Sequence, residues 1–158
     1  MRSKTAKIKV NEPDVRYHST RVAKLINRSM RDGKKSVAQK QVYRALERLE
    51  KQMNQKALDI FEEVIRRVSP QMEVRSRRVG GAAYQVPMPV KGRRGFSLAV
   101  RWIVDAARAR SNSSYHTYAD KLVAEMTDIL KNEGGAISKR DNAHKMAEAN
   151  RAFAHFRW

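Results

Sequence analysis

Cysteine is absent from this sequence of 158 residues. Without thiols the protein can form no disulfide, use no cysteine nucleophile and build no cysteine-type zinc site. Long apolar runs are missing as well, because no stretch approaches the roughly 18 residues that a membrane-spanning helix needs. The first ten residues carry cations but lack the apolar segment of a secretory signal. We therefore expect an intracellular protein that has no contact with a membrane.

Acidic residues are scarce relative to basic ones. The chain holds 34 Lys and Arg against 16 Asp and Glu, which gives a net charge of +18 at neutral pH. Such an excess disfavours a compact chain by self-repulsion unless a polyanionic partner offsets it. It is also the electrostatic footprint of nucleic-acid binding. A surface charged only for solubility would show mixed charge of modest net sign, so the composition favours a nucleic-acid partner.

Residues that could form a catalytic or metal-binding site do not cluster in the sequence. Ser19 and Ser138 could be nominated as nucleophiles, but both are better explained as helix caps. The segment Gly33-Lys34-Lys35-Ser36 is similar to the end of a P-loop, yet it lacks the earlier glycine and the preceding strand. We expect no enzymatic activity, no metal and no cofactor. The histidines are scattered and form no HExxH motif: His18, His116, His144 and His155.

Apolar residues recur every three or four positions over most of the chain, which predicts about six helices. Ser36 followed by Gln39 has the spacing of a capping box for the second helix. Ser138 with Asp141 should cap the last one, while Asp32-Gly33 should end the first. The first three expected helices run from Ser19 or Thr20 to Arg31, from the Ser36 cap along an apolar stripe whose last residue is Met53, and along the Leu58–Val68 stripe. The last three run from Phe96 or Ser97 to Arg110, from Tyr118 to Ile129 before Gly134-Gly135, and from Ser138 almost to Trp158.

Residues 72–90 change to a two-residue rhythm of apolar and polar side chains on both sides of Gly80-Gly81, which predicts a β-hairpin. Pro87 and Pro89 lie two positions apart and remove two N–H groups from one edge of their strand. We therefore expect an isolated arm with an edge protected against further pairing. The predicted fold is mainly α: a helical bundle with an inserted, protruding two-stranded arm, in one domain spanning residues 1–158.

Two basic segments flank these elements. Residues 1–13 lack periodicity and are expected to form a basic N-terminal extension that orders on phosphate groups. The segment Lys91–Gly95 is expected to be a basic hinge before the fourth helix. From Arg75 to Arg101 the chain carries seven cations and no acid. Arginine predominates among them, and its planar guanidinium suits bidentate contact with phosphate.

Aromatic residues raise two further hypotheses. Tyr84 in the arm is a candidate for stacking on a nucleic-acid base, and cross-strand packing beside Val74 is the alternative. Near the end of the sequence, Phe153, Phe156 and Trp158 alternate with cations. Fraying would leave these rings exposed to water, so we expect them to dock against the body or a neighbouring molecule.

Several motifs resemble the bacterial form of one ribosomal family. They are Asp32–Ser36, Val74–Pro87 with its Arg-Ser-Arg-Arg-Val-Gly-Gly core, Arg101–Arg108, and Lys145–Trp158. Their residues closely resemble the seventh protein of the small ribosomal subunit. The match runs in order along nearly the whole chain, and the motifs of the arm and of the C-terminal segment are highly specific to that family.

The resemblance implies a non-enzymatic protein that binds the 3′ major domain of 16S rRNA and nucleates assembly of the subunit head. It implies a position at the subunit interface near the decoding centre, with the arm close to exit-site tRNA and with mRNA as a further candidate. The ninth and eleventh small-subunit proteins are the implied neighbours, and no autonomous homo-oligomer is expected. The implied location is a cytoplasmic ribosome of bacterial type, with an organellar ribosome left open. The implied RNA-binding residues are Arg2, Lys4, Lys7, Lys9, Lys34, Lys35, Arg75, Arg77, Arg78, Lys91, Arg93, Arg94 and Arg101.

Two other functions compete with this interpretation. A DNA-bending protein also uses basic β-arms, but such arms usually carry an apolar wedge at the tip, where this sequence has Gly80-Gly81. An RNA-modifying enzyme would need a catalytic constellation that the sequence lacks. Since the major groove of A-form RNA is too deep and narrow for side chains, an RNA-binding protein of this kind should recognise backbone shape rather than a base code.

Overall fold

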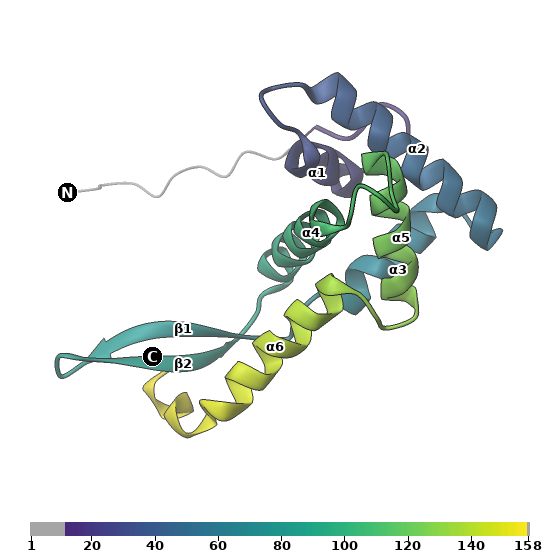
Figure 1. Ribbon diagram of the computed structural model, residues 1–158. Coiled ribbons are helices and arrows are strands. Elements are labelled where there is room, and N and C mark those ends of the chain that lie inside the picture. Colours follow the sequence, from purple (N-terminus) through teal and green to yellow (C-terminus); the bar gives the residue numbers. More distant parts are fainter. Residues whose placement is uncertain (1–11, 158) are drawn as a thin grey trace.

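The computed structural model describes residues 12–157 and confirms the predicted fold class. Within these residues helices dominate, and a single hairpin extends from the helical body (Figure 1). The elements are α1 (Thr20–Ser29), α2 (Lys35–Met53), α3 (Ala57–Val68), β1 (Met72–Val79), β2 (Ala82–Pro89), α4 (Gly92–Ala109), α5 (Tyr118–Leu130), α6 (Gly135–Ala149) and a short 3-10 helix η1 (Arg151–Phe156).

Apolar side chains from all six α-helices form one hydrophobic cluster. Leu46, Phe61, Ile65 and Leu122, which follow the predicted stripes, are all buried in it, whereas Trp102 is only partly buried at its margin. Helix α5 occupies the middle of the body and contacts α2, α3, α4 and α6. Burial of each large apolar side chain contributes roughly 1.5–3 kcal/mol, so this core holds the helices together without covalent links.

The hairpin follows the predicted pattern at its turn. Strands β1 and β2 pair antiparallel, and the pair Val79↔Ala82 flanks Gly80-Gly81. Both glycines have positive φ, +58° and +89°, which a two-residue type I′ turn requires. Within the described residues, β1 and β2 pair only with each other. The predicted two-stranded ribbon is therefore confirmed.

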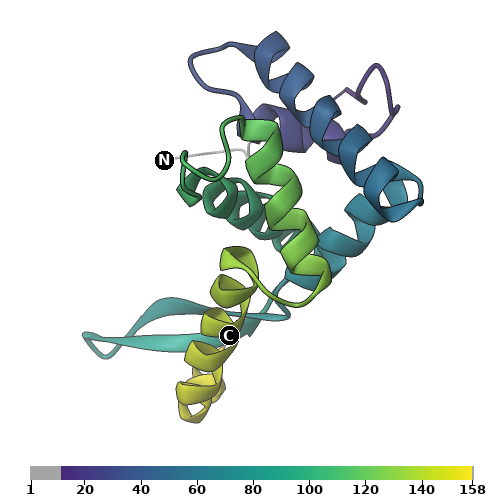
Figure 2. The same cartoon turned by 45° about the vertical axis from the view of Figure 1, so that its right-hand side comes forward.

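The expectation that the hairpin is isolated is wrong. Helix α6 runs beside β1, and η1 lies against β2, as both ribbon views show (Figure 1, Figure 2). Pro87 is buried and lines a small cavity together with His144 and Ala147 of α6 and Ala154 of η1. Residues 135–156 fold back across the strands, and this contact spans too much sequence for a local pattern to reveal it.

Two predicted serine caps are also wrong. Asp32 and Gly33 both have positive φ and turn the chain so that α2 begins at Lys35, with Lys34 as its N-cap. Ser36 therefore lies inside the first turn. The first helix accordingly ends at Ser29, before the predicted Arg31.

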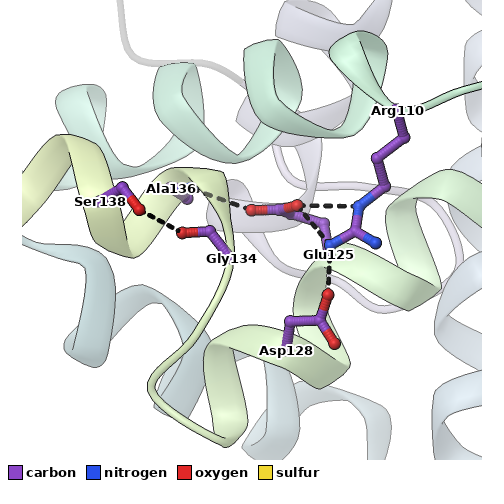
Figure 3. A network of polar contacts seen from close by, with 6 residues as sticks. All are labelled: Arg110, Glu125, Asp128, Gly134, Ala136 and Ser138. Carbon is purple, nitrogen blue, oxygen red and sulfur yellow. Dashed lines mark hydrogen bonds and ion pairs between the residues drawn. The ribbon is translucent and has the colours of Figure 1, made fainter.

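At the last helix, Gly134 is the N-cap, with φ +95°, and α6 begins at Gly135. The Ser138 hydroxyl donates to the Gly134 carbonyl oxygen at 3.1 Å from within the first turn (Figure 3). It is therefore not the predicted cap. The helix ends at Ala149, and η1 follows it, whereas a continuous helix almost to Trp158 was expected. Trp158 itself lies outside the described residues.

The predicted hinge before the fourth helix is wrong too. Helix α4 already begins at Gly92, and Lys91 is its N-cap in an extended conformation. The amides of Arg94 and Gly95 both donate to the Lys91 carbonyl oxygen, at 2.8 and 2.9 Å. Glycine has low helix propensity, which is why Gly92 and Gly95 suggested a hinge. Consequently Arg93 and Arg94 sit on a rigid helical turn.

Candidate nucleic-acid interface

Seven predicted RNA-binding cations lie along β1 of the hairpin and on the N-terminal part of α4. They come from β1, from the N-cap of α4 and from the first three turns of α4, and all are exposed. Exposed cations on rigid elements can reach phosphate groups without loss of buried contacts. The set, hereafter the hairpin–α4 cations, is Arg75, Arg77, Arg78, Lys91, Arg93, Arg94 and Arg101.

The register of the hairpin divides its arginines between two faces. Residues paired across the strands share a face, and successive residues alternate. Arg75 pairs with Val86 and Arg77 with Tyr84, whereas Arg78 pairs with Ala83 on the opposite face. The hairpin therefore presents cations on both sides, as a basic arm inserted between RNA segments requires.

Glu73 ties this basic region together. One carboxylate oxygen accepts from Arg75 Nε at 2.7 Å, and the other accepts from Arg94 Nε at 3.1 Å. The Glu73 side chain is only 12% exposed. Partial burial would raise the pKa of Glu73, but hydrogen bonds from Arg75 and Arg94 outweigh it and lower that pKa below its usual value. The carboxylate is ionised at neutral pH and fixes the hairpin to the first turn of α4.

The remaining predicted sites lie elsewhere. Lys34 and Lys35 are exposed at the start of α2. The loop before α2 lies at the far end of the molecule from the hairpin in both ribbon views (Figure 1, Figure 2). The N-terminal cations Arg2, Lys4, Lys7 and Lys9 lie outside the described residues. The structure therefore separates the two described sets of candidate residues.

Tyr84 belongs to an aromatic cluster within the protein. Its ring centroid lies 5.3 Å from that of Phe153 and 5.1 Å from that of Phe156. The two phenylalanines therefore dock within the protein, against the hairpin, while Trp158, the third aromatic residue of that expectation, lies outside the described residues. The alternative of packing beside Val74 is wrong, because Val74 pairs with Pro87 on the other face. Stacking of Tyr84 on RNA stays a prediction, and any base would have to share the ring with this cluster.

A buried polar network that the sequence analysis missed fixes the base of α6. Arg110 donates from Nε and Nη2 to one oxygen of Glu125, at 2.9 and 2.7 Å, and also pairs with Asp128 (Figure 3). The other Glu125 oxygen accepts from the Ala136 amide at 2.9 Å. Burial would lower the pKa of Arg110, but the hydrogen bonds to Asp128 and Glu125 raise it.

The position of Glu125 in the sequence contained a signal. It lies three residues after Leu122 and so falls on the buried stripe of α5, where a carboxylate needs a partner. A Cβ atom at Gly134 would approach Glu125 Oε1 to 3.0 Å. The glycine is therefore required both by its positive φ and by the carboxylate beside it.

Further contacts continue from this network along α6. Arg140 Nη1 donates to the carbonyl oxygen of Arg67 at 2.7 Å, which links α6 to α3. His144 Nε2 accepts from the Gln71 amide at 3.0 Å, immediately before β1. Helix α6 is thus held by α3, α4 and α5 at one end and supports the hairpin at the other. This arrangement fixes the direction of the arm relative to the body.

Asp14, directly after the predicted extension of residues 1–13, has a buried side chain that anchors the chain. Its carboxylate accepts from the amides of Arg16 and Tyr17 at 3.2 and 3.1 Å and from the Tyr43 hydroxyl at 2.6 Å. The segment before α1 is therefore attached to α2 from residue 14 onward.

Neither a metal site nor a membrane span is evident in residues 12–157. No group of three or more His, Asp or Glu side chains in that range could hold a metal ion. Likewise, no helix in the described part of the chain is both long and apolar enough to cross a bilayer.

Comparison with known proteins points to one family. The family described as ribosomal protein S7p/S5e matches residues 1–151. A protein of Pelagibacter ubique named small ribosomal subunit protein uS7 is 48% identical over 157 residues, 99% of each chain. Proteins with the same name from Dictyoglomus thermophilum and Thermosipho melanesiensis are 53% identical over 92% of each chain and 51% identical over 100% of each.

Proposed function

The chain belongs to the ribosomal protein S7p/S5e family, and from this premise we propose that it is a primary binder of the 3′ major domain of 16S rRNA. As a structural constituent of the small ribosomal subunit, it acts through position and charge rather than catalysis. Its binding nucleates assembly of the subunit head. Residues 1–158 act as one RNA-binding domain on a cytoplasmic ribosome of bacterial type, without forming a homo-oligomer.

The hairpin–α4 cations carry this proposal. They are exposed, they come from two rigid elements, and Glu73 fixes those elements to each other. A preset group of arginines binds phosphates with little loss of side-chain freedom. Two RNA segments that would otherwise repel each other can be held together on the two faces of such an arm.

The hairpin also supports a proposal about position. It projects away from the helical body (Figure 1), so its tip can reach partners that the body does not touch. We assign the tip to the neighbourhood of exit-site tRNA and mRNA, at the subunit interface near the decoding centre. The ninth and eleventh small-subunit proteins are the proposed protein neighbours.

Binding to separate domains of 16S rRNA tests the main proposal. The protein should bind a transcript of the 3′ major domain at least tenfold more tightly than a transcript of the 5′ domain at the same salt concentration, because non-specific binding measures only phosphate density. Equal affinity for the two transcripts would rule out the proposed specificity. Competition with duplex DNA tests the DNA-bending alternative, which predicts that DNA displaces the RNA efficiently.

A further inference from the structure

A cavity of about 450 Å³ opens at the end of the body far from the hairpin. Its walls come from the α1–α2 loop, the start of α2, the end of α4 and the start of α5. Figure 2 shows the loop before α2 and the loop between α4 and α5 beside the start of α5, and residues of these segments line the same cavity. A volume of this size falls within the range of roughly 300–1,000 Å³ that small-ligand pockets occupy.

Positive charge lines this cavity without compensation. Four lining residues are basic, and none of the described lining residues is acidic: the basic ones are Arg31, Lys34, Arg108 and Lys121. Within residues 12–157, none of the four forms an ion pair with a carboxylate. A cavity of this kind attracts an anion.

Two of the cations are held in place by neutral groups. Lys121 is only 8% exposed, and its Nζ donates to the Arg110 carbonyl oxygen at 2.5 Å and to Asn112 Oδ1 at 2.6 Å. Arg108 Nη2 donates to the Ser29 carbonyl oxygen at 3.0 Å. Carbonyl and amide oxygens orient these side chains but leave their full charge in place. A buried ammonium without an anion is costly, and a bound phosphate would offset that cost.

The same cavity has an apolar and aromatic part. Val37 lines it and remains 54% exposed, in contrast to the buried apolar residues of α2. Tyr118 also lines it, with its hydroxyl 2.8 Å from Ser29 Oγ. Partial burial raises the pKa of Tyr118, so its ring stays neutral at physiological pH. Phosphates on the outside of an RNA duplex need exposed cations but no apolar wall, so this combination suits a ligand with both an anion and a flat ring.

We propose that this cavity binds one unpaired nucleotide of the RNA, with its phosphate among Arg31, Lys34 and Lys121 and its base against Val37 and Tyr118. The inference rests on the proposed function and adds a second contact to it, at the far end from the hairpin. Single-stranded bases in loops and bulges are the part of folded RNA that proteins read with aromatic side chains. An acidic peptide is a less favoured ligand for the cavity, because Lys34 at its edge is followed by the exposed Lys35, and both belong to the proposed RNA-binding surface.

The variant Val37→Glu tests the site without disturbing the core. It places a carboxylate among the four cations, and a negative charge in the first turn of α2 also suits the positive end of the helix dipole. The matched control is Val15→Glu, which makes the same change at a valine that is 80% exposed and does not line the cavity. Relative to this control, V37E should weaken binding to 16S rRNA by roughly tenfold, the loss expected for one stacked base.

The proton resonances of the His116 ring give a direct readout of occupancy, because His116 lines the cavity. They are assigned from the variant His116→Gln. Adenosine monophosphate should shift them in wild type and in V15E but not in V37E, and inorganic phosphate should shift them less. If phosphate alone shifts the resonances as much as adenosine monophosphate does, the cavity binds an anion but not a base. A shift only with a polyglutamate peptide would replace RNA with a protein partner.

The two proposals fail in different ways. If wild type binds 16S rRNA and V37E binds it as tightly as V15E, the cavity inference is wrong while the proposed function stands. If wild type does not prefer the 3′ major domain, the proposed function is wrong, and the nucleotide titration still decides what the cavity binds.

Discussion

At the scale of single residues, Glu73 decides how the hairpin–α4 cations act. It is a carboxylate in contact with Arg75 and Arg94, two positions before a run of cations that contains no acid of its own. Because its pKa is lowered in the folded protein, its contribution to stability is complete above the ordinary glutamate pKa of about 4.3. That contribution is lost as the pH falls through the lowered folded value.

Replacing Glu73→Gln removes this contribution to stability at neutral pH and should also change RNA binding. The variant removes one negative charge from the basic region, so affinity for rRNA should rise at low salt, and the slope of log K against log salt should steepen by up to about 0.9. The matched control is Glu50→Gln, the same charge change at an exposed position of α2. Filter binding across a salt series measures the affinity and the slope for both variants. Weaker binding by E73Q alone would mean that the orientation Glu73 imposes on Arg75 and Arg94 matters more for affinity than the positive charge it cancels.

At the scale of elements, the hairpin itself was predictable from the sequence, but its packing against α6 and η1 was not. The alternation of apolar and polar side chains, the Gly80-Gly81 turn and the prolines all lie within fewer than twenty residues, so local sequence patterns predict the hairpin. Contact of Tyr84 with Phe153 joins residues that no local pattern connects. The exposed cations were foreseeable for the same local reason. The cavity beside α5 was not, because four separate segments form it.

A shortened hairpin tests whether the length of the arm affects RNA contacts independently of the folding stability of the protein. Removing two cross-strand pairs next to the turn keeps the parity of the register, so Gly80-Gly81 would then join the pair Arg77↔Tyr84. Reach falls by roughly 7 Å, since each residue spans about 3.4 Å. Helical content and the denaturant midpoint should change little, because the buried base of the hairpin remains. The residues omitted are Arg78, Val79, Ala82 and Ala83.

For this variant we expect a moderate loss of rRNA affinity and faster release of exit-site tRNA from assembled subunits. Circular dichroism, RNA titration and a tRNA-release assay measure the three properties separately. Replacing Val79→Ser at full hairpin length serves as the control for composition at the tip. A large drop in the denaturant midpoint would show that the tip belongs to the cooperative fold.

At the scale of the whole molecule, net charge and core act in opposite directions. The apolar cluster of six helices favours the compact state, while an excess of 18 positive charges opposes it by self-repulsion. A polyanion relieves that repulsion when it binds. Folding stability and RNA binding should therefore be coupled through salt.

Salt should weaken RNA binding steeply but increase the folding stability of the isolated protein. If about six phosphates are neutralised, log K should fall with log salt at a slope near −4 to −5. Over the same range, the midpoint of thermal unfolding of the isolated protein should rise, because screening reduces self-repulsion. Isothermal titration and thermal scans from low to physiological salt measure the two trends. A flat binding curve would contradict the electrostatic account.

The hairpin packs against α6 and η1, which are synthesised after it. The strands leave the translating ribosome well before residues 135–156, which later pack against both of them. Domains generally form from the N-terminal side during synthesis, so the five preceding helices can assemble while the arm still lacks its support. The arm acquires its direction only after these late residues arrive. A nascent or prematurely terminated chain therefore lacks the geometry that the mature protein offers to RNA.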